Sequence, residues 1–445
     1  MLESIIYSLA IMKTAIQKNI HLVKRCFLIL ITLFPVGYYF FTVWKYTVNI
    51  PVADDYDVIL HFINDFYLAD TWKTKLALLN KPVNMHKIVP SRIIMASMLS
   101  AKCYLDLRWI VKVGNLFLIP IAFFFYASID KSKKHWLFSL AASAFILFNF
   151  HYYSFIFLPI VPIQFATSTA LSLMCLWSLV QKKGMSMDIG SGLLLIISIL
   201  SNTNGLLLIV IGFFHILTSK EKRKKLIIWS IASVVGICLY KYGNHGYTQS
   251  SFFSVILTNP LHVFRKLAIL LGNSLAIRLP LDIIVSEVFG YLLMSISALI
   301  LIKHKLFLKE KPFLFYCFIL FLCTAVMVTV GRANLPLAQA MSFRYRFNAT
   351  LLVLSICLLS YSYLREKIAL FIHITLALLI YYSSMTHYKR IGKFTSEIYA
   401  SMQNTLEGKD APMYYPNKKR AKAILEESIR LEVWKLEGSS NNHID

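Results

Sequence analysis

Uninterrupted apolar runs of the length that crosses a lipid bilayer recur along this chain of 445 residues. A bilayer offers backbone groups no water, so a spanning segment has to be a helix or part of a closed barrel. Barrel strands alternate apolar and polar residues, whereas these runs are continuous. Because 57% of the residues are hydrophobic and only 15% are charged, an ordinary soluble enzyme is excluded. The pattern predicts an all-α polytopic membrane protein.

Short basic clusters predict which ends of the helices face the cytoplasm. The chain has 46 Lys and Arg against 22 Asp and Glu, a formal net charge of +24. In a soluble protein this excess points to nucleic acid, but here it gathers in short loops, as the positive-inside rule describes. We therefore expect no nucleic-acid partner and place the N-terminus and five clusters in the cytoplasm. The clusters are 131–134, 181–183, 219–225, 303–311 and 364–367.

This assignment predicts about eleven transmembrane helices, with interfacial helices in the outer loops. The spans are 26–43, 110–129, 136–150, 155–180, 189–201, 205–217, 226–241, 283–302, 313–330, 347–363 and 368–384. The apolar stretches 88–104 and 252–277 are broken by charges, so we expect them to lie along the outer surface. An odd number of spans places the C-terminal tail, 385–445, on the extracytoplasmic side as a small α-helical unit, separate from the membrane domain 1–384.

Most of the unusual polar residues then share the outer side. Carboxylates, histidines, arginines and aromatic rings together suit recognition of a sugar and a phosphate, because rings stack on sugars and guanidinium groups match phosphate oxygens. They are Asp54, Asp55, Asp57, Asn84, His86, His151, Tyr152, Tyr153, Asn202, Thr203, Asn204, Asn244, His245, Arg278, Arg332, Arg344 and Arg346.

Each of these residues also has an ordinary structural explanation. The acidic pair Asp54–Asp55 is typical of a solvated loop, and a histidine such as His86 more often bonds to structure than to substrate. Arg344 and Arg346 are typical of helix ends at lipid head groups. The seven cysteines form no CxxC or Cys/His cluster, so they predict neither a disulfide frame nor a metal site.

Three motifs resemble the GT-C class of integral-membrane glycosyltransferases, in particular bacterial members that modify lipopolysaccharide and O-antigen. The motifs are an acidic DDYD loop after the first span, an N-x-H-[KR]-I-V-x-x-R motif and a late GRA…QA-x-S-x-RY-x-F motif, at 54–57, 84–92 and 331–347. The layout of 26–384 is similar as well. One position departs from the pattern: Met85 stands where relatives carry an acidic residue between Asn and His.

The resemblance implies an inverting transfer of a sugar, such as glucose, from a polyprenyl-phosphate carrier to a lipid-linked glycan at the outer face of a bacterial inner membrane. It implies that Asp54 or Asp55 is the general base that deprotonates the acceptor hydroxyl. The donor phosphate is then expected to contact basic and polar groups. Those groups are His86, Asn84, Arg332, Arg344, Tyr345 and Arg346. No second acidic motif accompanies the DDYD loop, so we expect no metal and no other cofactor.

Two other functions remain open at this stage. An O-antigen polymerase is also polytopic and basic, but it needs a large later outer loop with paired basic motifs, and 242–282 holds few basic residues. A flippase or transporter usually shows charges within spans or inverted repeats, which this sequence lacks. A scaffold without catalytic activity predicts that no outer polar residue matters individually.

Overall fold

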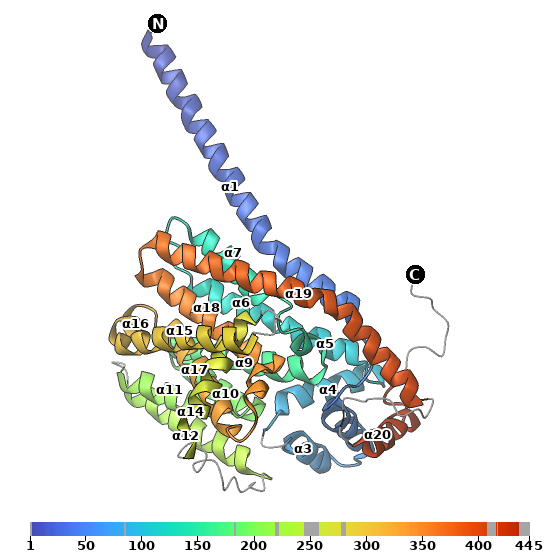
Figure 1. The fold of residues 1–445 in the computed structure, drawn as a ribbon. Helices are drawn as coiled ribbons and strands as arrows, with labels where there is room; N and C mark the ends of the chain where they lie inside the picture. The colour runs from blue at the N-terminus through green and yellow to red at the C-terminus, as the bar shows by residue number, and fades with distance from the viewer. Residues whose placement is uncertain are drawn as a thin grey trace.

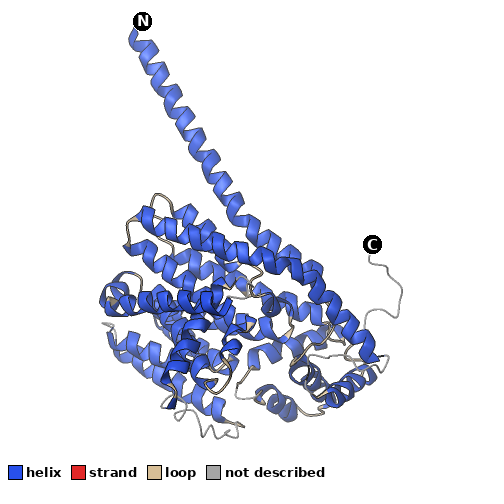
Figure 2. Ribbon diagram, in the orientation of Figure 1, coloured by secondary structure: helices blue, strands red, loops and turns tan. Residues whose placement is uncertain are grey.

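A computed structural model describes residues 2–83, 86–181, 184–218, 222–243, 258–276, 282–406, 415 and 417–435. Within these ranges the chain is helical apart from short connections and one isolated β-bridge (Figure 2). The helices are α1 Leu2–Tyr46, α2 His61–Leu68, α3 Trp72–Asn80, α4 Val89–Lys102, α5 Leu107–Leu116, α6 Leu118–Ser128, α7 Trp136–Leu147, α8 Tyr153–Phe157, α9 Ile160–Val180, α10 Gly184–Ser201, α11 Gly205–Thr218, α12 Lys222–Lys241, α14 Pro260–Gly272, α15 Asp282–Ile302, α16 His304–Glu310, α17 Pro312–Gly331, α18 Phe343–Tyr363, α19 Glu366–Leu406 and α20 Lys418–Arg430. A π-helical turn, η1 Tyr56–Leu60, leads into α2, and two 3₁₀ turns are η2 Asn273–Leu275 and η3 Leu337–Met341.

The helices lie where the apolar runs predict them, but fewer are long and apolar enough to cross a membrane than the eleven expected. Seven in the described part meet that requirement, and their spanning stretches are Leu22–Tyr46, Leu107–Ser128, Ile160–Val180, Gly184–Ser201, Asp282–Ile302, Pro312–Gly331 and Glu366–Asn404. At 12 and 14 residues, α7 and α11 reach only about 18 and 21 Å, against a hydrocarbon core of about 30 Å. The first turns of α12 and α18 carry two or more basic residues each, which shortens their apolar parts. The fold is that of a helical membrane protein, and the count of eleven spans is not confirmed.

Contacts link the basic clusters 131–134, 303–311 and 364–367 at one end of the helical bundle. The backbone N–H of His135, just after 131–134, donates to the Glu366 carboxylate at 2.7 Å. The Tyr363 hydroxyl donates to a carbonyl within 303–311 at 3.1 Å. Lys225 pairs with Asp188 at 3.6 Å. These contacts bring the loops before α7, α17 and α19 together, while the predicted outer residues lie at the opposite ends of the same helices.

Two apolar cores hold the described part of the molecule together. The larger surrounds α18, whose residues are buried on nearly every side, and includes α7, α9, α11 and α17. The smaller joins η1, α2, α4 and the start of α5 to the end of α19 and to α20, at the lower right of Figure 1. The predicted boundary at residue 384 falls inside α19, which continues as one helix of 41 residues to Leu406. The predicted tail helix exists as α20, and it packs on the first outer loop.

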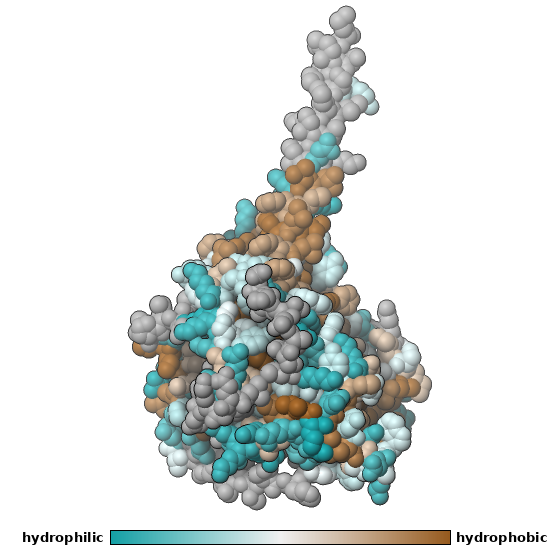
Figure 3. Space-filling view, turned by 90° about the vertical axis from the view of Figure 1, so that its right-hand side faces the viewer, coloured by the Kyte–Doolittle hydropathy of each residue, from teal (hydrophilic) through white to brown (hydrophobic). Residues whose placement is uncertain are grey.

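Helix α1 projects from the body and shows apolar side chains to its surroundings (Figure 3). Phe27, Leu30, Phe34 and Phe41 are each more than half exposed. A continuous apolar surface of this kind is not stable in water and fits contact with lipid tails.

Two glycines allow the backbones of α14 and α15 to pack closely against each other. A Cβ added at Gly290 lies 1.7 Å from the Ala268 carbonyl oxygen, and one at Gly272 lies 1.8 Å from the Ser286 carbonyl oxygen. Small residues of this kind let helix backbones touch in a membrane. We expect Gly290→Ala to push the helices apart and lower the free energy of unfolding by about 1–3 kcal/mol. Gly190→Ala on α10, where nothing lies within 4 Å of the added atom, is the matched control in thermal unfolding of the detergent-solubilised protein. Equal melting temperatures for the two variants would contradict this packing role.

Candidate functional site

Asp55 is a buried carboxylate that fixes the acidic loop to the bundle. Its side chain is 0% exposed. One oxygen accepts the Val52 N–H at 2.8 Å and the other accepts the N–H of Ile160, the first residue of α9, at 3.0 Å. Burial raises the pKa of Asp55 from 3.8 to about 7. The negative charge of Asp54 contributes to this rise, and the two hydrogen bonds from backbone N–H groups oppose it. Asp55 is therefore placed to position the turn, with no surface left for a substrate.

Asp54 lies at the tip of the same turn and, unlike Asp55, is exposed. The Asp55 N–H closes the turn by bonding to the Val52 carbonyl at 3.1 Å. Ala53 adopts a left-handed conformation with φ of 53°, which is uncommon for a residue with a side chain and is found at functional sites. Asp54 is exposed, and its carboxylate has no hydrogen bond or ion pair with any residue that the structure describes. Of the two aspartates, Asp54 is the one available to a substrate.

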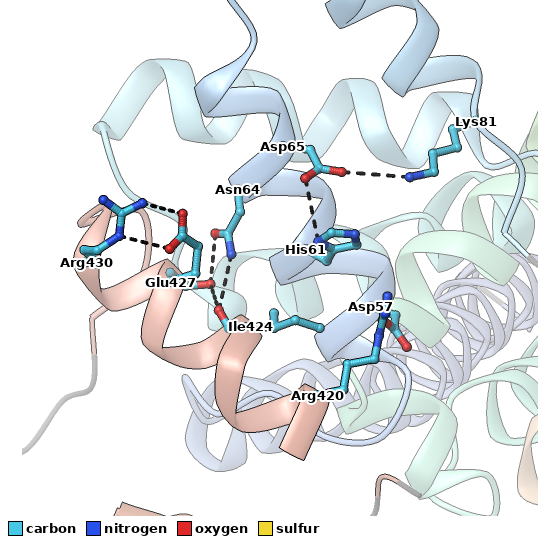
Figure 4. A network of polar contacts seen from close by, with 10 residues as sticks. Asp57, His61, Asn64, Asp65, Lys81, Arg420, Ile424, Glu427 and Arg430 are labelled. Atoms are coloured by element: carbon cyan, nitrogen blue, oxygen red, sulfur yellow. Dashed lines mark hydrogen bonds and ion pairs between the residues drawn. The ribbon is translucent and has the colours of Figure 1, made fainter. Parts of the chain in front are cut away.

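Asp57, one turn further on, is bound by the C-terminal segment. Its carboxylate accepts the Arg420 Nε–H at 2.7 Å and the Tyr415 hydroxyl. It lies in η1, and π-helical turns occur frequently at functional sites. Figure 4 shows that Arg420 reaches Asp57 from the start of α20, while the middle of α20 bonds to Asn64 on α2. The acidic turn is thus held from the α9 side by Asp55 and from the α20 side by Asp57.

His86 belongs to a second polar group, built on the turn between α10 and α11. Its Nδ1 lies 2.5 Å from the Thr203 hydroxyl oxygen, which lies 2.9 Å from the Tyr240 hydroxyl oxygen at the end of α12. Burial, with a smaller contribution from the charge of Arg332, lowers the pKa of His86. The imidazole is therefore neutral near pH 7. Asn84, predicted beside it, lies outside the described residues.

Arg332, directly after α17, extends this second group. Its guanidinium carbon lies 5.4 Å from the centre of the Tyr345 ring, and it is half-buried. In the described ranges no carboxylate pairs with it. The Tyr345 hydroxyl is buried and has no hydrogen-bond partner there either. A cation without an anion beside a phenol without a partner is an arrangement that an anionic ligand completes.

The two arginines near the start of α18 occupy different environments. Arg344 is exposed, and within the described part of the chain it has no acidic partner. Arg346 is buried, and its guanidinium donates to the Asn273 side chain at 2.8 Å and to the His151 carbonyl at 3.1 Å. Its Nη1 lies 3.1 Å from the His387 Nε2. Arg346 therefore joins α18 to the turns around it, whereas Arg344 remains accessible.

Three buried cations that the sequence motifs did not explain hold the surrounding backbone. Lys87 donates to the carbonyls of Asn80 and Tyr242, and Arg92 donates to that of Leu78 at 2.8 Å. Lys266 donates to the Arg332 carbonyl at 2.6 Å and to two more in the same loop. A buried charge is stable only when it is hydrogen-bonded, and each of these has at least two carbonyl acceptors. Lys87 and Arg92 in the second motif are structural residues.

The acidic turn and the arginines lie at the same end of the bundle without direct contact. Among the described residues, neither Asp54 nor Asp55 forms an ion pair or hydrogen bond with Arg332, Arg344 or Arg346. The segment from His151 to Ile160 connects the two groups. Its first residue bonds to Arg346, its last bonds to Asp55, and the Tyr153 ring packs on Phe343 at 4.9 Å.

Several residues at this end carried no signal in the sequence strong enough to find them, among them Lys266, Asn273, Tyr240, His387 and Arg420. Each works through a partner far along the chain, for example 73 residues away for Asn273 and Arg346. No three His, Cys, Asp or Glu side chains in the described ranges lie close enough together to hold a metal ion. The expected metal independence stays a prediction.

Comparison with known families, with curated proteins and with solved structures finds no match to this chain.

Proposed function

We propose that the chain transfers a sugar from a polyprenyl-phosphate carrier to a hydroxyl of a lipid-linked glycan, with inversion at the anomeric carbon. The observation that carries the proposal is that one end of the bundle presents both an exposed carboxylate and arginines without an acidic partner in the described part of the chain. An exposed carboxylate, Asp54, sits on a turn fixed by Asp55. At the same end of the bundle, Arg332 and Arg344 have no acidic partner in the described part of the chain.

In this reaction Asp54 accepts the proton of the acceptor hydroxyl as its oxygen attacks the anomeric carbon. One C–O bond forms, and the C–O bond to the lipid phosphate breaks. The phosphate leaves with the negative charge, which Arg332 stabilises together with the exposed Arg344. The neutral His86 adds a hydrogen bond to a phosphate oxygen, and Tyr345 supports the Arg332 guanidinium with its ring. Asp55 and Arg346 position these groups and touch no substrate.

The proposal includes a location. The acidic end faces the periplasm of a bacterial inner membrane, and the basic clusters face the cytoplasm, with the N-terminus cytoplasmic and α20 periplasmic. The support is the separation of basic clusters from acidic and aromatic residues between the two ends. Labelling of single cysteines at residues 54 and 365 with a membrane-impermeant reagent tests it. We expect the cysteine at 54 to react from the periplasmic side and the one at 365 not to react.

Transfer itself is tested with the purified chain in proteoliposomes. A panel of polyprenyl-phosphate monosaccharides is offered with lipid-linked glycans, and mass spectrometry detects one added sugar per acceptor. Absence of any product across the panel would contradict the proposed reaction. Growth of long chains would indicate polymerisation instead.

Arg332→Ala is expected to raise the KM for the lipid-linked donor by about 10- to 100-fold, because a hydrogen bond to a charged group contributes about 1.5–3 kcal/mol. The KM for the acceptor should stay near that of the parent. Arg365→Ala, which removes an exposed arginine at the opposite end of the bundle, is the matched control. An unchanged donor KM in Arg332→Ala, measured by initial rates, would remove Arg332 from the phosphate site.

A further inference from the structure

A cleft outside the proposed site lies between the end of α4 and the start of α5. It is lined by Met98, Ala101, Lys102, Tyr104, Asp106 and Trp109, and its wall is almost entirely apolar. The one carboxylate in the lining, Asp106, is 5% exposed and accepts three hydrogen bonds from the Arg108 guanidinium, at 2.7, 3.0 and 3.2 Å. The cleft therefore presents no unpaired negative charge to a ligand.

Lys102 and Trp109 line this cleft, and Lys112 and Trp44 lie against Trp109, so that the four residues form its rim. The Lys102 ammonium lies 4.6 Å from the Trp109 ring, and the Lys112 ammonium lies 3.9 Å from the Trp44 ring on α1. The two indole rings meet edge to face at 5.8 Å. The Lys112 ammonium also lies 5.0 Å from the Trp109 ring, so this ring contacts both ammonium groups, and each ammonium carries three N–H donors.

The rim lies where two spanning stretches meet. One ends at Tyr46, two residues after Trp44, and the other begins at Leu107, two residues before Trp109. From the rim, exposed apolar side chains continue along the same helices away from the cleft. They are Phe41 on α1 and Leu116, Ile119 and Phe123 on α5 and α6, each between 49% and 62% exposed. Tryptophan and lysine at such a boundary are typical of the membrane interface.

We propose that this cleft is a binding site for an anionic phospholipid of the surrounding bilayer. The phosphate binds between the ammonium groups of Lys102 and Lys112. The glycerol backbone packs on Trp109 in the apolar cleft, and the acyl chains follow Phe41 and Leu116. An added choline or ethanolamine cation brings a third positive charge beside two ring faces that already hold lysines, so a zwitterionic lipid fits less well. This site is independent of the proposed sugar transfer.

The experiment uses the full chain in nanodiscs of phosphatidylcholine with a small fraction of either brominated phosphatidylglycerol or brominated phosphatidylcholine. Bromine quenches tryptophan fluorescence on contact. In the parent we expect brominated phosphatidylglycerol to quench more strongly than brominated phosphatidylcholine. This preference for phosphatidylglycerol should fall about tenfold in the double variant Lys102→Ala with Lys112→Ala. The double variant with arginine at both positions should keep it.

The matched control lies on α3, where Trp72 is exposed and the Lys75 ammonium lies 5.7 Å from its ring. Lys73→Ala with Lys75→Ala should leave the preference unchanged. Equal quenching of the parent by the two lipids would overturn the proposal, and so would a preference that survives in the alanine variant. Native mass spectrometry of the parent needs no variant. Phosphatidylglycerol retained through delipidation supports the site, and its complete loss opposes it.

Discussion

Asp54→Asn is expected to lower the turnover of sugar transfer by about 10²- to 10⁴-fold, the usual contribution of a general base. The amide keeps the size of the side chain and cannot accept the proton of the acceptor hydroxyl. Because Asp54 is exposed and bonds to no described residue through its carboxylate, the variant should fold and melt like the parent. The measurement is the initial rate in proteoliposomes together with a melting curve of the same preparation.

Two further variants serve as comparisons for Asp54→Asn. Asp70→Asn removes another exposed aspartate, between α2 and α3, and should leave the rate unchanged. Asp55→Asn places an NH₂ group opposite a backbone N–H of residue 52 or 160, so it should reduce both the rate and the melting temperature. A normal rate in Asp54→Asn would show that the exposed aspartate is not the base.

Trp434→Ala is expected to release the C-terminal helix from the acidic loop, with a loss of about 3–5 kcal/mol of local stability. Trp434 is 0% exposed, and its indole N–H donates to the Asn49 side chain at 3.2 Å. Asn49 also bonds to the Lys435 carbonyl and to the Leu107 N–H, at 2.9 and 2.8 Å. Removing the indole thus opens a cavity in the smaller core and weakens a junction of three chain segments.

Hydrogen exchange and limited proteolysis measure this release directly. Amides of α20 should exchange faster in Trp434→Ala, and cleavage between α19 and α20 should increase. Trp434→Phe, which keeps most of the apolar volume, should lose less. Ile429 lies on the same helix and is 44% exposed, so Ile429→Ala is the matched control and should behave like the parent. Unchanged protection of α20 in Trp434→Ala would show that the helix is held by other contacts.

Apolar periodicity located the helices because burial or lipid contact constrains every residue of a long run. The tail helix was predicted from its own repeat, and it is present as Lys418–Arg430. Its partner was not predictable, since the Asn64–Ser428 contact joins residues 364 positions apart. The count of eleven spans is not confirmed, because an apolar run of 12 residues such as α7 resembles a span in sequence but is shorter than the hydrocarbon core of a bilayer.

The candidate site was likewise predictable from the sequence only in part. Sequence reasoning brought the acidic loop, His86 and the arginines to one end of the bundle, and the structure places the described ones there. It did not distinguish Asp54 from Asp55, or Arg344 from Arg346. Adjacent or alternate residues on a turn or helix face different directions, and only packing decides which of them is buried. The proton acceptor and the phosphate ligands themselves stay predictions.

The ion pair between Asp57 and Arg420 has a consequence for the order of events during biosynthesis. The acidic turn emerges from the ribosome more than 350 residues before its basic partner, since the two are 363 positions apart. Until Tyr415 and Arg420 have been translated, the Asp57 carboxylate lacks the two side chains that donate hydrogen bonds to it. A nascent chain that stops before this point carries helices α1 to α19 but lacks the contacts of Tyr415 and Arg420 with Asp57, so full support of the acidic turn requires translation of the segment that holds these two residues.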